Sequence, residues 1–63
     1  MGVSFRFGDP VRLGAGMQRE WPDIGNRAGT AERVDEGKRM VEVHWAILGA
    51  RMYLPFDEVE HVK

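Results

Sequence analysis

The sequence contains no cysteine, so a disulfide framework, a thiolate metal site and a cysteine nucleophile are all excluded. Long apolar runs are also lacking: no stretch free of charged residues and histidine exceeds six residues, and we expect no membrane-spanning segment. The first 20 residues show no secretory signal, which favours a cytoplasmic protein. Neither sign of charge dominates, since nine Lys and Arg oppose ten Asp and Glu. The net charge of −1 argues against a dominant polyanion-binding face.

The 63 residues are enough for one small domain, and we assign 1–63 to it, with residues 1–4 expected to be frayed. Hydrophobic residues make up 43% and charged residues 30%, the balance of a globular chain. Eight glycines divide the chain into pieces of strand length and leave no room for a helix of three turns. Within 38–48, Val41, Val43 and Trp45 alternate with mostly polar residues, a period of two that is typical of a strand.

These signals predict five short strands, at about 5–13, 28–34, 39–46, 50–54 and 59–62. Between them we expect a long, polar, irregular loop over 14–27, a glycine turn over 35–38, a tight connection over 47–49 and a single 3₁₀ turn over 55–58. A partly closed barrel hides strand edges with the fewest residues, so the sequence predicts an all-β, five-stranded, partly open barrel. The expected core consists of Val11, Leu13, Val34, Val41, Val43, Trp45, Leu54, Val59 and Val62.

Four segments together resemble the SH3-like small-barrel superfamily. They are G-D-P-V-R-L at 8–13, G-T-A at 29–31, V-E-V-H-W at 41–45 and L-P-F-D-E-V-E-H-V at 54–62. The resemblance covers about residues 8–62 and implies an SH3-like barrel with a long first loop and a 3₁₀ turn before the last strand. These barrels host many unrelated functions, so the resemblance implies a fold rather than an activity. We expect a member of bacterial or phage type.

The segment after Trp45 departs from the superfamily pattern, which has Asp-x-Gly or Asn-Gly there. Ala46-Ile47-Leu48-Gly49 replaces it and puts two aliphatic residues at the expected hairpin tip. Apolar side chains at an exposed tip favour contact with a partner chain or a second copy of the protein. The alternative is that one of them folds back under the long loop.

The long loop contains Arg19 and Trp21, two residue types that are common in interaction hot spots. In SH3-like barrels the equivalent loop often forms one wall of the ligand groove. The alternative is that Trp21 covers the open end of the barrel as part of the core, with Ile24 beside it.

Pairing of the third and fourth strands predicts a polar and aromatic patch, in which Glu42 and His44 lie beside Arg51 and Tyr53. Tyr53 suits a stacking platform and Arg51 an anchor. The alternative is a solvated sheet face that is stabilised by cross-strand ion pairs.

Catalytic and metal-binding patterns are not found. His44 and His61 are far apart and lack metal-ligand spacing, and the only serine, Ser4, lies near the chain end. We therefore expect no catalytic residue, no metal and no cofactor. The plasmid-encoded type II dihydrofolate reductases are SH3-like chains of similar size, but M-Y-L-P at 52–55 is only loosely similar to their V-Q-I-Y-P segment, so an enzyme is not expected.

The leading hypothesis is a non-catalytic interaction module that binds a protein partner or associates with itself. Its candidate binding residues are Arg19, Trp21, His44, Ile47, Leu48, Arg51 and Tyr53. The alternative is a nucleic-acid-binding small barrel of the ribosomal or transcription-elongation type, because arginine suits phosphate contacts. Five arginines fall within the first 33 residues, at 6, 12, 19, 27 and 33. No membrane partner is expected.

Overall fold

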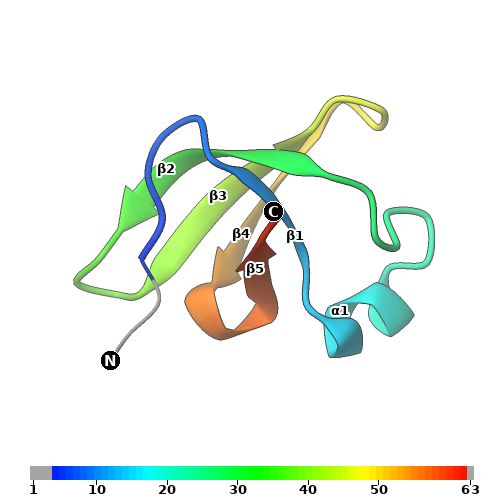
Figure 1. Cartoon of the computed structure of the whole chain (residues 1–63), viewed down its shortest axis with the longest axis horizontal. Coiled ribbons are helices and arrows are strands. Elements are labelled where there is room, and N and C mark those ends of the chain that lie inside the picture. Colours follow the sequence, from blue (N-terminus) through cyan, green and yellow to red (C-terminus); the bar gives the residue numbers. More distant parts are fainter. Residues whose placement is uncertain (1–3, 63) are drawn as a thin grey trace.

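The computed structural model describes residues 4–62 (Figure 1). Five strands, all paired antiparallel, form one sheet in the order β4-β3-β2-β1-β5. The elements are β1 (Pro10–Leu13), a short helix α1 (Ala15–Glu20), β2 (Gly29–Asp35), β3 (Met40–Trp45), β4 (Ala50–Pro55), a 3₁₀ turn η1 (Phe56–Glu58) and β5 (Val59–His61). The predicted all-β fold, its five strands and its 3₁₀ turn are confirmed. Most of the residues expected to be frayed, 1–3, lie outside the described residues.

The sheet is curled, because its two edge strands are consecutive in the chain. Neighbouring strands lie about 4.8 Å apart, so a flat five-stranded sheet would separate its edges by about 19 Å. Only the three residues of η1 join β4 to β5, and a 3₁₀ turn of that length spans about 6 Å. The sheet must therefore roll until β4 and β5 approach each other, which gives the partly open barrel (Figure 1).

The alternation of side chains in β3 sets the inner and outer sides of the sheet. Val41, Val43 and Trp45 are fully buried on the inner side. The intervening residues are half-buried on the outer side. The period-two pattern therefore predicts correctly which side of this strand faces the core.

Most of the expected core is observed. Val11, Leu13, Leu54 and Val59 are buried together with the three β3 residues, whereas Val34 and Val62 are only half-buried. Val34 still packs against the core near the end of β2, whereas Val62 lies beyond the last residue of β5, and the expectation for Val62 was wrong. Four further buried residues were not expected: Phe5, Ile24, Ala31 and Phe56.

A β-bulge in β2 changes which of its residues face the core. Its register against β3 shifts between Ala31, which pairs with Val43, and Arg33, which pairs with Glu42. One extra residue, Glu32, is thereby accommodated on β2. After it, the alternation of inward-facing and outward-facing side chains along the strand is shifted by one residue. The bulge explains why Arg33 shares a face with Glu42.

The first strand begins later than predicted, at Pro10 instead of Phe5, because a turn precedes it. Gly8 has φ 90°, a conformation that glycine adopts readily, and Asp9 Oδ2 accepts a hydrogen bond from the Arg6 N–H at 2.9 Å. This turn spans 6–9, since the Asp9 N–H also donates to the Arg6 carbonyl at 3.1 Å. It folds Phe5 back into the core, where its ring meets the edge of the Phe56 ring at a centroid distance of 5.1 Å.

The long first loop is not irregular throughout, since α1 occupies Ala15–Glu20. The expectation of loop structure was wrong there because glycines at 14 and 16 are poor helix formers and hide the signal. Tertiary contacts supply the missing stability: Gln18 Nε2 donates to the Leu13 carbonyl at 2.9 Å, and Met17 packs against the core. No helix within residues 4–62 is long and apolar enough to cross a membrane.

Trp45 ties the sheet to the end of the long loop. Its indole is fully buried, and Nε1 donates to the carbonyl of Arg27 at 3.3 Å. The lack of a side chain at Gly29 allows the backbone there to pack against the indole. A Cβ at this position would lie 2.9 Å from Trp45 Nε1 and 2.8 Å from a Val43 methyl group. Segment 27–29 is thus held against the end of β3, next to the β3–β4 turn.

Candidate functional site

The turn between β3 and β4 presents two aliphatic side chains to solvent. Ile47 is 61% exposed and Leu48 is 47% exposed. The backbone of the turn is hydrogen-bonded, because the Leu48 N–H donates to the Trp45 carbonyl at 3.1 Å. Gly49 adopts φ 61°, a conformation that glycine takes readily. Neither aliphatic side chain folds back under the long loop, so the alternative interpretation of this turn does not hold.

Trp21 lies at the C-terminal end of α1 and is 48% exposed. Its backbone carbonyl accepts hydrogen bonds from the N–H groups of Ile24, at 3.0 Å, and Gly25, at 2.9 Å. The resulting turn directs Ile24 into the core, where only 2% of it is exposed. The interpretation that both residues cover the barrel is therefore right for Ile24 and wrong for Trp21. Arg19, two residues earlier on α1, is exposed as well.

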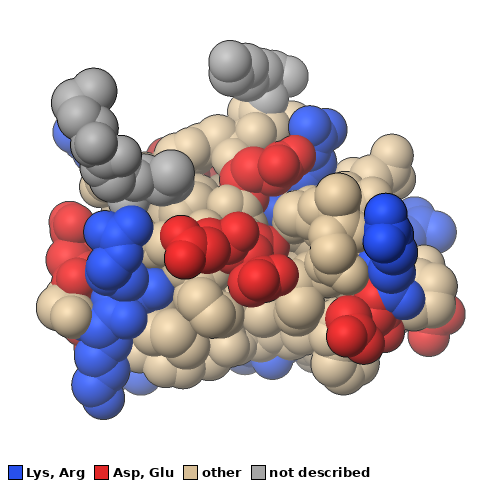
Figure 2. Space-filling model, turned by 90° about the horizontal axis from the view of Figure 1, so that it is seen from below, with Lys and Arg blue, Asp and Glu red and all other residues tan. Residues whose placement is uncertain are grey.

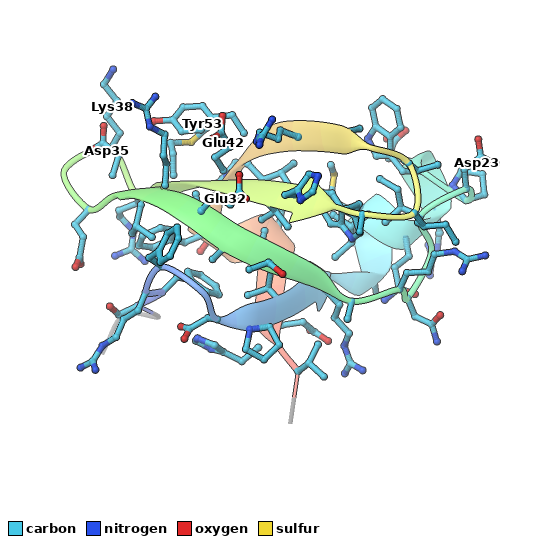
Figure 3. The ribbon with its side chains drawn as sticks, turned by 90° about the horizontal axis from the view of Figure 1, so that it is seen from above. Asp23, Glu32, Asp35, Lys38, Glu42 and Tyr53 are labelled. Atoms are coloured by element: carbon cyan, nitrogen blue, oxygen red, sulfur yellow. The ribbon has the colours of Figure 1, made fainter. Side chains whose placement is uncertain are left out.

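These exposed apolar residues lie at one end of the molecule. In Figure 1 the β3–β4 turn lies at the upper right and the loop that follows α1 lies below it on the right, and in Figure 3 the turn and the labelled Asp23 both lie on the right. The hydrogen bond between Trp45 and Arg27 joins the two segments. We name Trp21, Ile47 and Leu48 the apolar end.

The second group of candidate residues lies on the outer face, defined as the solvent-facing side of β2, β3 and β4. The register places Arg51 opposite His44 and Tyr53 opposite Glu42, as predicted. Arg51 Nε donates to Glu32 Oε1 at 2.7 Å, and His44 Nδ1 lies 3.9 Å from Glu32 Oε2. The cross-strand ion pair of the alternative interpretation is therefore present.

The ion pair also changes the acidity of its members. The hydrogen bond from Arg51 holds the pKa of Glu32 below its ordinary value and raises the pKa of Arg51. Tyr53 remains 50% exposed beside this pair. The guanidinium is thus oriented by the protein itself, and a ligand would meet a fixed arginine and a free aromatic ring.

A shallow groove of about 490 Å³ runs along the outer face and is lined by Arg33, Val34, Asp35, Glu42 and Tyr53. Figure 3 shows Asp35, Glu42 and Tyr53 near the same end of the sheet. Of these five residues, sequence reasoning selected Tyr53 as a binding residue. Arg33 was named only among the arginines of the nucleic-acid alternative and was not placed on this face, because the β2 bulge that turns it there leaves no clear signal in the sequence.

No family model, no curated protein and no solved structure matches the chain. Its own residues therefore carry the assignment of function.

The seven candidate residues fall into two groups that the fold keeps apart. Trp21, Ile47 and Leu48 form the apolar end, with Arg19 on the adjoining helix, while the remaining three residues lie on the outer face. A further exposed aromatic residue, Phe7, is 79% exposed and was not selected. It neighbours Gly8, whose N–H donates to the Ala31 carbonyl at 2.7 Å, so it lies beside the middle of β2.

Other polar contacts stabilise the sheet around β1 and β5. Arg12 Nε donates to Glu60 Oε1 at 2.7 Å, and His61 Nε2 lies 3.2 Å from Asp9 Oδ2. The pKa of Asp9 is lowered, first by the hydrogen bond from the Arg6 backbone and then by His61. Among the described residues, no group of three His, Asp or Glu side chains could hold a metal ion.

Proposed function

We propose that the protein is a non-catalytic interaction module that binds a protein partner or a second copy of itself. The observation that carries this proposal is the apolar end, where Ile47 and Leu48 are 61% and 47% exposed on the β3–β4 turn and Trp21 is 48% exposed after α1, at the same end of the molecule (Figure 1). Tryptophan and large aliphatic residues dominate the energetics of protein interfaces. Arg19, on the adjoining helix, would supply a polar contact at the rim of this surface, and the outer-face residues His44, Arg51 and Tyr53 would form a separate polar contact surface.

We also propose that the chain is an SH3-like small barrel. Five antiparallel strands, a long first loop and a 3₁₀ turn between β4 and β5 support this proposal. The bacterial or phage origin and the cytoplasmic location remain predictions.

Nucleic-acid binding is the alternative, and the placement of the arginines gives it less support. Arg12 is paired with Glu60, and Arg33 shares its groove with Asp35 and Glu42. Figure 2 shows acidic and basic side chains interspersed on the face it presents, without a continuous basic patch. A salt titration with a DNA or RNA oligonucleotide separates the two functions, since phosphate contacts weaken steeply with salt.

Two variants test the proposed function: Trp21→Ala, and Ile47→Ser combined with Leu48→Ser. We expect both to reduce binding to peptides selected from a displayed random library by about five- to thirtyfold, because each removes an anchor worth about 1–2 kcal/mol. Calorimetry with the selected peptides measures the loss, and circular dichroism should show an unchanged fold.

Phe7→Ser is the control, since it removes an apolar residue that is 79% exposed, more than any residue of the apolar end, and that lies away from that end. Retained binding in the control with loss in the two test variants supports the proposal. Unchanged peptide binding in the test variants, or strong salt-sensitive binding of the oligonucleotide, rejects it.

A further inference from the structure

The sheet has one long edge that no strand covers. Within residues 4–62, β4 pairs only with β3, and Figure 3 shows it at the rim of the ribbon. An edge strand carries backbone N–H and C=O groups that can pair with another strand. The hydrogen-bond pattern of β4 shows which groups these are.

The Phe56 N–H donates to the Arg39 carbonyl at 2.9 Å, which continues the β3–β4 register by one pair beyond Met40 and Pro55. In an antiparallel ladder, hydrogen-bonded pairs alternate with non-hydrogen-bonded pairs. The backbone groups of 50, 52 and 54 therefore point toward β3. Those of Arg51, Tyr53 and Pro55 point out of the open edge.

Pro55 limits what can pair with this edge. It has no N–H, and its ring nitrogen faces outward, where a strand tolerates proline. Arg51 and Tyr53 then provide the two free N–H donors of the edge. A partner strand that uses both donors fully must lie opposite 50–54 and be centred near Met52.

We propose that the protein forms a two-fold symmetric dimer through antiparallel pairing of β4 with β4 of a second copy, centred on Met52. This dimer rests on the proposed function, because that function is binding either to a protein partner or to a second copy. It goes beyond the proposed function by placing the contact between two copies at the β4 edge instead of the apolar end. The two sheets then join into one of ten strands.

The side chains of β4 favour this register over its neighbours. Centring on Met52 places Arg51 of one copy opposite Tyr53 of the other, twice, and each pair can form a cation–π contact. Each of these pairs also exchanges two hydrogen bonds, four in all. On the inner side, small Ala50 meets large Leu54, and two half-buried Met52 side chains cover each other.

The neighbouring registers of the same parity are worse. Centring on Arg51 would oppose two like charges directly, and like charges at opposed positions are destabilising. Centring on Tyr53 would pair Arg51 with Pro55, which cannot donate. A second copy of this chain is thus complementary to the edge in one register.

Charge reversal at the centre tests the dimer. Met52→Lys and Met52→Glu each put two like charges face to face at the symmetry axis, whereas an equal mixture of the two puts opposite charges there. We expect wild type to dimerise between about 1 µM and about 1 mM, each variant alone to dimerise at least about tenfold more weakly, and the mixture to recover. Light scattering at several concentrations measures the mass, with circular dichroism as the check on folding.

A second pair of variants keeps the proposal testable should Met52→Lys or Met52→Glu fail to fold. Arg51→Pro removes the outward N–H, while Arg51→Ala removes the same side chain and keeps the N–H. We expect Arg51→Pro to abolish the dimer and Arg51→Ala to weaken it by about five- to thirtyfold, the range of the two exposed cation–π contacts that the substitution removes from a symmetric dimer.

The Ile47→Ser and Leu48→Ser double variant separates this proposal from the proposed function, because it should lose peptide binding and keep the dimer. A wild-type monomer up to about 1 mM overturns the β4 dimer, as does a mixture that fails to recover. Loss of the dimer in the double variant also overturns it, since self-association would then use the apolar end.

Discussion

The two edges of the sheet, β4 and β5, differ in how much backbone they leave free. On β5, the Val62 N–H donates to the Pro10 carbonyl at 3.0 Å, so alternation turns Val59 and His61 outward. The Val59 N–H is bonded to the Phe56 carbonyl at the end of η1. The His61 N–H is then the one outward donor of β5, whereas β4 presents those of Arg51 and Tyr53.

Side chains strengthen the contrast. The His61 ring stacks on Phe5 at a centroid distance of 4.6 Å, and the Glu60 carboxylate is paired with Arg12. The β5 edge is therefore short and tied back onto its own chain, while β4 has six residues and a half-exposed tyrosine. Natural sheets protect edges that must stay unpaired. The difference indicates that β4 is the edge available for recognition.

Among the variants that compare the two edges, Phe5→Ala beside β5 is expected to lower the unfolding free energy most. Phe5 is 2% exposed and packs on Phe56, so its loss should cost about 3–5 kcal/mol of unfolding free energy. That is comparable to the whole stability of a domain of this size. Urea unfolding followed by circular dichroism measures the loss.

Tyr53→Ala on β4 is the comparison variant. Because Tyr53 is 50% exposed, we expect a loss of about 1 kcal/mol or less at a protein concentration low enough to keep the chain monomeric. Equal destabilisation by the two variants would show that the β4 edge is as deeply integrated into the fold as β5.

The smallest effect concerns two carboxylates: Glu32 of β2, which is paired with Arg51 of β4, and Asp9, which lies 3.2 Å from the His61 ring of β5. Both have lowered pKa values, from ordinary values of 4.5 and 3.8, so each stabilises the folded state fully only above its ordinary pKa. This stabilisation is lost as the pH falls through the lowered pKa. Glu32→Gln and Asp9→Asn should each reduce the unfolding free energy slightly at pH 7 and not at about pH 2.

Urea unfolding at both pH values measures these differences. Both carboxylates are partly buried, with side chains 28% and 29% exposed, so a small and similar pH dependence of the unfolding free energy is expected at the two edges. A pH dependence that is unchanged in both variants would contradict the assigned causes of the pKa shifts.

The fold was predictable where residues alternate with a period of two. Val41, Val43 and Trp45 identify β3 and the core side of the sheet, and the glycines mark the turns around it. The early part of the chain was less predictable. Phe5 reaches the core only through the turn at Gly8, and α1 is stabilised by contacts with β1, so neither can be read from local pattern.

The candidate site was predictable to a similar degree. The exposure of Ile47 and Leu48 could be predicted because these aliphatic residues occupy a turn where Asp, Asn and Gly are usual. The position of Arg51 opposite His44 follows from the pairing of the two strands. The ion pair of Arg51 with Glu32 spans β2 and β4, so it depends on a bulge that the sequence does not reveal.

Amide hydrogen exchange over a range of protein concentrations tests the central claim most directly. If β4 pairs with β4 of a second copy, the Arg51 and Tyr53 amide protons will exchange more slowly as concentration rises, while the His61 amide proton will exchange at a constant rate. Exchange at Arg51 and Tyr53 that stays fast at every concentration would contradict it.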